Sequence, residues 1–182
     1  MKTHLHVSLV QPNIVWENPD ANIHLAEKLL KKVSPPSEII IFPEAFTTGF
    51  TMNPQYLDKI EGTPGLSYFV EKAKSMKKVF LVGLFSREEE YLYNRYFWIN
   101  PDGTYVYYNK RHLFSFAGEH LYFRHGTEPL IVHYEGLKFH LNLCYDLRFP
   151  VWTKNRYYKE KDEYAYDFLI FGANWPEKRK NI

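Results

Sequence analysis

Short apolar runs that alternate with two helix-like segments place the strongest limit on how this chain can fold. Residues 4–10 (HLHVSLV) alternate polar and apolar side chains, which predicts a strand with one buried face. The runs IIIF at 39–42 and VFLVGLF at 79–85 are apolar over the length of a strand. Because helical segments separate these runs, the pattern predicts a β-α-β-α-β order and a sheet with helices packed on it.

The helical segments have recognisable beginnings. Asn18 is suited to cap the first helix, and Pro19 occupies the first helical position, where its missing N–H costs nothing. The apolar residues predicted on the buried face of this helix are Ile23, Ala26, Leu29, Leu30 and Val33. Prolines at 35 and 36 end it, and residues 65–78 (GLSYFVEKAKSMKK) predict the second helix.

The second half of the chain changes to paired strands. Residues 91–100 and 104–110 predict a hairpin around the turn PDG, and Glu135–Gly136 predicts a second turn between 130–134 and 137–145. We expect a helix over 149–164 and a last strand within 166–175. These elements predict one α/β domain over residues 1–182.

Composition excludes several classes of protein. The chain has 23 basic and 21 acidic residues, so its net charge of +2 gives no reason to expect nucleic acid or anionic lipid as a partner. A single cysteine cannot form an intrachain disulfide, which favours a reducing compartment. The apolar runs are too short for a bilayer span, and no signal peptide is evident at the start. We therefore expect a soluble, cytoplasmic protein that does not bind a membrane.

Three ionisable residues each follow a predicted strand. Glu44 ends IIIFPE, Lys110 ends TYVYYNK and Cys144 ends KFHLNLC. Each has an ordinary alternative role, because a loop glutamate or lysine is usually solvated and a lone cysteine is usually a small core residue. Strand ends in sheets covered by helices are, however, frequent sites of ligand binding. We therefore consider the three residues together.

A thiol, a carboxylate and an ammonium make chemical sense as one site. A free thiol is mostly protonated near neutral pH and needs activation before it can act as a nucleophile. Glu44 can take the proton of Cys144, and Lys110 can offset the developing oxyanion. A helix opening at RFP would add backbone N–H groups directed at the same point. This combination suits acyl transfer through a thioester.

The segments around these residues resemble a known family. FPEAFTTGF, NKRHLF and LCYDLRFP resemble the three signature blocks of the nitrilase superfamily of carbon–nitrogen hydrolases, and GANWP resembles a fourth block. The resemblance extends over essentially the whole chain and implies an α-β-β-α sandwich, which lacks its C-terminal part here. TTGFTMNP and FAGEH are most similar to the omega-amidase branch, which hydrolyses the terminal amide of 2-oxo dicarboxylic acid monoamides.

The resemblance implies a role for each matching residue. Cys144 becomes the nucleophile, Glu44 the general base, and Lys110 the group that stabilises the tetrahedral oxyanion. The backbone N–H of Tyr145 becomes a second oxyanion donor, and Glu119 matches the additional glutamate that orients groups near the nucleophile. No metal or organic cofactor is required. The resemblance also implies a small-molecule amide substrate and a homodimer or larger homo-oligomer.

Three further residues are candidates for the substrate pocket. Arg148 can hold a substrate carboxylate with two hydrogen bonds, or it can brace the loop by pairing with Asp146 or Glu119. Asn174 and Trp175 are expected to line the pocket, although a tryptophan at a strand end is more often packing. We leave both interpretations of Arg148 open at this point.

Two other functions are weaker alternatives. The histidines of RHLFSFAGEHLYFRH lack the spacing of a zinc motif, and the acidic stretches REEEY and KEKDEY argue against binding of single-stranded nucleic acid.

Two further alternatives concern the reaction itself. Activity as another aliphatic amidase or as a nitrilase fits the same residues. Because the chain stops soon after its last predicted strand, an inactive scaffold or assembly subunit is the alternative from a different class.

Overall fold

A five-stranded sheet forms the first half of the molecule. The structure is a computed structural model that describes residues 4–175. The sheet has the order β1-β2-β3-β4-β5, in which β1, β2 and β3 are parallel and β3, β4 and β5 are antiparallel. Its strands are β1 (Val7–Leu9), β2 (Ile39–Ile41), β3 (Val79–Glu88), β4 (Tyr91–Ile99) and β5 (Tyr105–Asn109).

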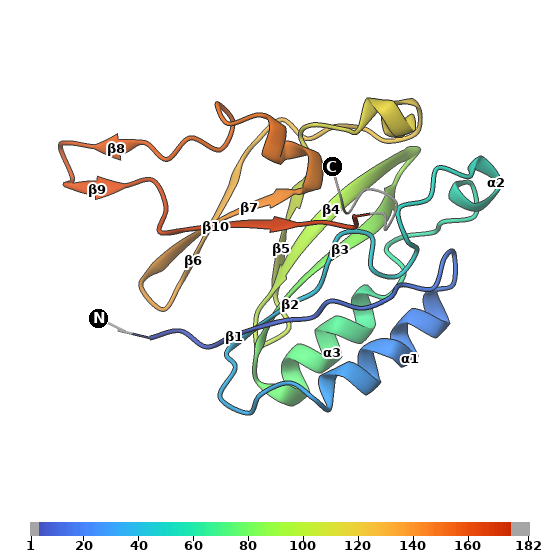
Figure 1. The fold of residues 1–182 in the computed structure, drawn as a ribbon, viewed down its shortest axis with the longest axis horizontal. Helices are drawn as coiled ribbons and strands as arrows, with labels where there is room; N and C mark the ends of the chain where they lie inside the picture. The colour runs from blue at the N-terminus through green and yellow to red at the C-terminus, as the bar shows by residue number, and fades with distance from the viewer. Residues whose placement is uncertain (1–3, 176–182) are drawn as a thin grey trace.

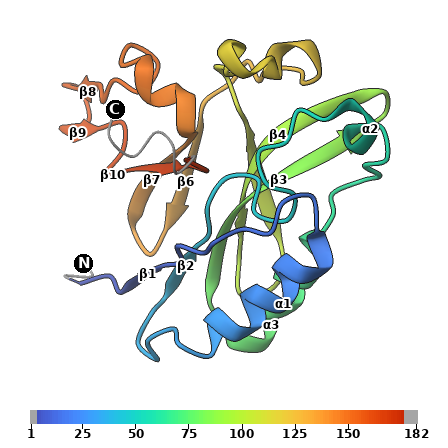
Figure 2. The same cartoon turned by 45° about the vertical axis from the view of Figure 1, so that its right-hand side comes forward.

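Helices α1 (Pro19–Leu30) and α3 (Leu66–Met76) cover one face of this sheet, as Figures 1 and 2 show. The prediction for the start of α1 is confirmed, because the Asn18 side chain accepts a hydrogen bond of 3.0 Å from the backbone N–H of Ala21. Buried Ala26 and Phe69 join the apolar side chains of the sheet in the core beneath the helices. A short helix, α2 (Pro54–Leu57), was not predicted, although Asn53 caps it in the same way.

A three-stranded sheet faces the other side of the first sheet. It has the order β10-β7-β6, with β10 parallel and β6 antiparallel to β7. Its strands are β6 (Leu130–Tyr134), β7 (Leu137–Leu143) and β10 (Phe168–Gly172). Phe139 and Leu141 of β7 share a buried core with Trp98 of β4. Two sheets packed face to face, with helices outside the first, form the predicted α/β sandwich.

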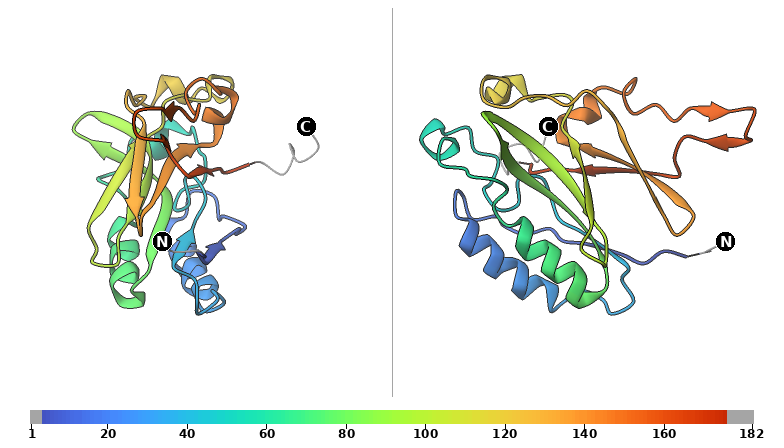
Figure 3. Two further views of the ribbon diagram at one scale, coloured as in Figure 1. Left: turned by 90° about the vertical axis from the view of Figure 1, so that its left-hand side faces the viewer. Right: turned by 180° about the vertical axis from the view of Figure 1, so that it is seen from behind.

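The layers seen in the described residues are helices, sheet and sheet (Figure 3). The α-helices described within residues 4–175 are α1, α2 and α3, and Figure 3 shows none of them on the outer face of the β10-β7-β6 sheet. Both predicted hairpins are present, and Glu135 and Gly136 turn between β6 and β7 with φ values of 51° and 80°. Within the same described part of the chain, no helix has the length and apolar character needed to cross a membrane.

The predicted helix over 149–164 is wrong. The segment forms turns and a small antiparallel hairpin, β8 (Tyr157–Tyr158) and β9 (Glu163–Tyr164), which projects as an arm in Figure 1. The segment lacks apolar residues at helical spacing, and tyrosines favour strands. Tyr157 and Tyr164 instead pair across the arm, with ring centroids 5.1 Å apart. Asn155 closes its base by bonding to both backbone groups of Tyr166.

Candidate active site

The three strand ends that the sequence indicated meet at one place. Glu44 lies three residues after β2, Lys110 directly after β5, and Cys144 directly after β7. Lys110 Nζ lies 2.7 Å from Glu44 Oε1, and both side chains are shielded from solvent. Glu44 and Lys110 follow strands of the first sheet, and Cys144, which lines the same pocket as Glu44, follows a strand of the second.

A glycine on the neighbouring strand allows Glu44 to approach the sheet. Gly83 of β3 donates a backbone hydrogen bond of 3.0 Å to Pro43 and accepts one of 2.8 Å from Phe46. A Cβ atom at position 83 would lie 2.5 Å from the Cα of Glu44. The side chain of any other residue would displace the backbone that carries Glu44, which explains the glycine inside an otherwise apolar strand.

Glu119 completes the charged cluster from a different direction. It begins the short 3₁₀ helix η2 (Glu119–Leu121), and its oxygens lie 2.9 and 3.2 Å from Lys110 Nζ. The backbone N–H of Phe114 also donates to it, at 2.6 Å. Burial raises the pKa of Glu119 above its ordinary value, Lys110 opposes this shift, and Glu44 adds to it. For Lys110, burial would lower the pKa, but the two carboxylates outweigh burial and raise it.

Asn94 is a member of the cluster that the sequence analysis missed. Its Nδ2 donates to Oε1 of Glu44 and to Oε1 of Glu119, both at 2.8 Å. It therefore holds the two carboxylates on either side of Lys110. The signal available in the sequence was an asparagine in the middle of a mostly aromatic and aliphatic strand, β4, and the structure buries its side chain with only 1% of its surface exposed. Its alignment opposite Phe85 on β3 emerges only from strand pairing.

Cys144 lies in a constrained turn at the end of β7. Its φ is +36°, a conformation that costs a residue other than glycine about 1–3 kcal/mol. It begins the 3₁₀ helix η3 (Cys144–Arg148), so the expectation that a helix opens later, at RFP, is wrong. Burial raises the pKa of the Cys144 thiol to about 12, with Glu44 adding to the shift and Lys110 opposing it. The thiol is therefore protonated near neutral pH, and the side chain of Glu44 lies beside it.

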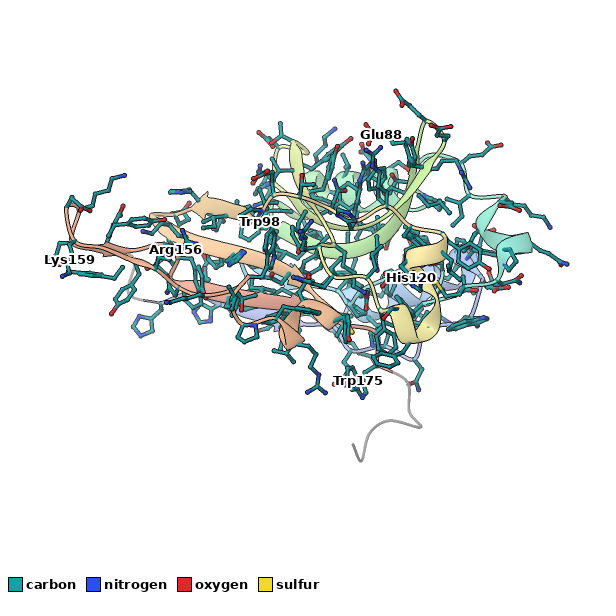
Figure 4. All side chains as sticks on the ribbon, turned by 90° about the horizontal axis from the view of Figure 1, so that it is seen from above. Glu88, Trp98, His120, Arg156, Lys159 and Trp175 are labelled. Carbon is teal, nitrogen blue, oxygen red and sulfur yellow. The ribbon has the colours of Figure 1, made fainter. Side chains whose placement is uncertain are left out.

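A pocket of about 270 Å³ opens onto Cys144 and Glu44. All four residues predicted to contact substrate line it, namely Tyr145, Arg148, Asn174 and Trp175. The backbone N–H of Asn174 also donates to Glu44 Oε2 at 3.2 Å. Figure 4 shows Trp175 on the side of the molecule that carries the short helical turns around His120. The volume suits a small molecule rather than a polymer.

Arg148 has no partner of opposite charge within the described residues 4–175. Neither of the two carboxylates considered in the sequence analysis, Asp146 and Glu119, pairs with Arg148. Asp146 accepts from Tyr108, His112 and Leu143, and Glu119 accepts from the cluster described above. The loop-bracing interpretation of Arg148 is therefore wrong. Its side chain remains an exposed cation at a pocket with mostly apolar walls.

Histidine does not form a metal site in the part of the chain that the structure describes. No group of three or more histidine, cysteine, aspartate or glutamate side chains within residues 4–175 is arranged to hold a metal ion. His112 donates instead to Asp146, and its ring stacks on Phe149 at a centroid distance of 3.7 Å.

The sequence of the chain is similar to a family model and to several curated proteins. Residues 6–163 match the family model described as carbon–nitrogen hydrolase. The omega-amidase YafV of Yersinia enterocolitica is 35% identical over 179 residues, which are 96% of this chain and 65% of that protein. The 2-oxoglutaramate amidase of Bacillus subtilis is 30% identical over 95% of this chain and 66% of its own length. The chain thus spans about two thirds of the length of these curated relatives.

Solved structures agree with the fold. XC1258 from Xanthomonas campestris, described as a CN-hydrolase superfamily protein with an arsenic adduct in the active site, is 36% identical, with a TM-score of 0.89. The match covers 96% of this chain and 66% of that one. The NitN amidase from a Nesterenkonia species shares the fold, with a TM-score of 0.77 at 18% identity.

Proposed function

This chain belongs to the carbon–nitrogen hydrolase family, and we propose that it is an amidase that cleaves a non-peptide C–N bond through a thioester on Cys144. The observation that carries the proposal is the buried Glu44–Lys110–Glu119 cluster beside a half-buried thiol, at the base of a small pocket. Burying charged groups costs desolvation free energy, so a buried ion cluster is poorly explained by stability alone. Here its members are of the types that acyl transfer requires.

Acylation begins with the neutral thiol. Glu44 accepts the proton of Cys144 as the sulfur attacks the amide carbon and forms the C–S bond. Negative charge develops on the carbonyl oxygen, where Lys110 and the backbone N–H of Tyr145 stabilise it. Collapse of the tetrahedral intermediate breaks the C–N bond, and the proton on Glu44 passes to the nitrogen. Ammonia leaves and a thioester remains on Cys144.

Deacylation uses the same groups, with water in place of the thiol as the nucleophile. Glu44 removes a proton from water as the water oxygen attacks the thioester carbon, and the same two donors stabilise the second oxyanion. The C–S bond then breaks, and the sulfur recovers the proton from Glu44. Glu119 keeps the Lys110 ammonium in place through both of its oxygens, so its role in the cycle is to orient that group. The products are a carboxylic acid and a restored thiol.

The proposed substrate is the terminal amide of a 2-oxo dicarboxylic acid monoamide, such as 2-oxoglutaramate or 2-oxosuccinamate. Two observations support this class. Arg148 is a cation at the pocket without a protein counter-charge in residues 4–175, as expected for a group that binds a carboxylate. In addition, the relatives described above are named omega-amidase and 2-oxoglutaramate amidase. Asn174 and Trp175 are proposed to position the rest of the substrate.

Ammonia release from 2-oxoglutaramate tests the activity. We expect release by the folded wild-type chain and none above background with Cys144→Ala. If folded wild type releases no more ammonia than the variant, the amidase proposal fails for this chain. The inactive-scaffold alternative predicts that result.

Arg148→Gln tests the substrate class separately. Loss of a charge-assisted contact should raise KM for 2-oxoglutaramate about tenfold or more. KM for an uncharged amide such as propionamide should stay unchanged, because that molecule has no carboxylate to bind. Turnover of simple amides or nitriles without turnover of 2-oxoglutaramate would instead identify another branch of the family. A homodimer or larger homo-oligomer, implied by the resemblance, and a cytoplasmic location, predicted from the single cysteine and the lack of a signal peptide, are part of the same proposal.

A further inference from the structure

The carboxylate of Asp146 lies outside the proposed reaction, yet it is fully buried and accepts four hydrogen bonds. Oδ1 accepts from the backbone N–H of His112 at 2.9 Å and from His112 Nδ1 at 2.7 Å. Oδ2 accepts from Tyr108 Oη at 2.8 Å and from the backbone N–H of Leu143 at 3.0 Å. Two of these groups are backbone N–H donors, so both oxygens of the Asp146 side chain serve as hydrogen-bond acceptors.

These donors flank the two groups that must meet in the reaction. Tyr108 and His112 lie two residues before and two residues after Lys110, and Leu143 directly precedes Cys144. Asp146 therefore joins the segment that carries the ammonium to the turn that carries the thiol. The first segment extends from β5 in one sheet, and the turn follows β7 in the other. Glu44 also contacts both Lys110 and the Cys144 thiol, but Asp146 differs in accepting hydrogen bonds from the backbone of both segments, at His112 and Leu143.

The rest of the network fixes Tyr108. Its hydroxyl donates to Asp146 and accepts from the backbone N–H of Arg111 at 3.0 Å and from Trp152 Nε1 at 3.1 Å. With one proton given and two received, the hydroxyl has a defined orientation. Asp146 consequently binds partners that are themselves held in place.

The turn at Cys144 needs such support. Its positive φ is unfavourable for a residue with a side chain, so it persists only where surrounding contacts impose it. The hydrogen bond from Leu143 N–H to the Asp146 side chain spans this turn and fixes the residue between strand and 3₁₀ helix.

We propose that Asp146 is a positioning residue that holds the Cys144 turn against the Lys110 segment, so that thiol, base and oxyanion donor stay aligned across the two sheets. The part of this inference that concerns turnover rests on the proposed amidase function. The part that concerns the thiol does not, since the reactivity of Cys144 is measurable without any amide substrate.

Asp146→Asn tests the inference with little change of shape. In either orientation its NH₂ group faces a backbone N–H, of His112 or of Leu143, that has lost its acceptor. We expect kcat for 2-oxoglutaramate to fall on the order of tenfold to a hundredfold, since small misplacements of reacting groups have effects of this size. KM should change less than about threefold, because the pocket wall is intact. A kcat equal to that of wild type would overturn the inference.

Alkylation of Cys144 by iodoacetamide at pH 7 provides the second readout. We expect Asp146→Asn to react about tenfold more slowly than wild type, because a displaced thiol loses Glu44 as its proton acceptor. An equal or faster rate would contradict the positioning role. If wild type shows no amide turnover but the alkylation rates differ as expected, the amidase proposal fails and the positioning role stands.

Variants at His112 decide the question if Asp146→Asn does not fold. His112→Leu removes the ring donor, whereas His112→Asn keeps an N–H at the place of Nδ1. We expect slower alkylation and lower kcat for His112→Leu, with recovery in His112→Asn, and equal rates in all three proteins would overturn the inference. Tyr166→Phe is the matched control, because it removes a buried hydroxyl that bonds Thr153, away from the cluster. Its kcat and alkylation rate should equal those of wild type.

Discussion

Two lysine–glutamate salt bridges in this molecule have the same charged groups but differ in burial. Lys110 and Glu44 meet at 2.7 Å with both side chains fully shielded from solvent. Lys138 of β7 and Glu163 of the β8–β9 arm meet at 3.1 Å with 16% and 45% of their side chains exposed. Figure 4 shows the arm, marked by Arg156 and Lys159, extending away from Trp175, which lines the pocket.

The comparison teaches that a salt bridge alone says little about function. The exposed pair is screened by water and contributes about 0–1 kcal/mol to stability. The buried pair gives up its hydration, which its mutual attraction repays only when further hydrogen bonds satisfy the remaining groups. Asn94 and Glu119 supply these hydrogen bonds around Lys110 and Glu44. Such an arrangement is explained by catalysis better than by stability.

Glu44→Gln should produce the largest change. It keeps the shape of the side chain but removes the proton acceptor, so kcat for 2-oxoglutaramate should fall about a thousandfold. Steady-state ammonia release measures the effect, and circular dichroism confirms that the variant is folded. A fall of less than about threefold would show that the buried pair does not contain the base.

Lys110→Met should lower both activity and stability. Loss of an oxyanion donor predicts a fall in kcat of about a hundredfold or more. Two carboxylates without their cation should also lower the free energy of unfolding by about 3–5 kcal/mol. Urea unfolding measures this change. Adding Glu44→Gln and Glu119→Gln should restore much of the stability without activity, and failure to do so would contradict the role of buried charge.

The pH dependence of Cys144 alkylation should differ from that of a free thiol. A free thiol with a pKa of about 8.5 becomes about thirtyfold more reactive between pH 7 and 10, as its thiolate fraction rises. In the folded protein the pKa is raised to about 12, so the thiolate fraction stays small and reactivity should keep rising, about tenfold per pH unit, without levelling off below pH 10. A rise centred near pH 8.5 would show that the thiol is neither buried nor next to a carboxylate.

Asn94→Leu should have a smaller effect. It removes the NH₂ group that joins Glu44 to Glu119 but leaves both contacts of Lys110 in place. We expect kcat to fall about tenfold through misalignment of the base. Asn94→Asp replaces the NH₂ group with a carboxylate that repels Glu44 and Glu119, so it should reduce kcat further than Asn94→Leu. Activity equal to wild type in both variants would exclude a role for Asn94.

Lys138→Ala should have the smallest effect. The pair with Glu163 is partly exposed, so its loss should change the free energy of unfolding by less than about 1 kcal/mol. The kcat value should be unchanged. A loss of activity comparable to that of Lys110→Met would contradict the distinction between the buried and the exposed pair.

Much of the fold followed from local patterns in the sequence. Strand alternation, the Asn18 cap and the turn residues Glu135–Gly136 act over a few neighbouring residues, so the order of elements and both hairpins could be predicted. The segment 149–164 could not, because its charges and tyrosines have no helical period. Its hairpin is fixed by contacts such as the base formed by Asn155 and Tyr166.

The candidate site also contains residues that could be predicted from the sequence and residues that could not. Glu44, Lys110 and Cys144 were identifiable because each is an ionisable residue directly after an apolar strand. Asn94 and Asp146 were not, because their roles depend on which groups other strands bring to them. Arg148 was left between two interpretations until the structure showed that other donors satisfy both candidate carboxylates.

Trapping of the acyl intermediate tests the role of Cys144 most directly. Folded wild type mixed with 2-oxoglutaramate and quenched in acid at short times should carry the mass of the acyl group on the peptide that contains Cys144. The adduct should be absent from Cys144→Ala, which should release no ammonia. Steady ammonia release while the Cys144 thiol stays unmodified at every quench time would contradict the thioester mechanism.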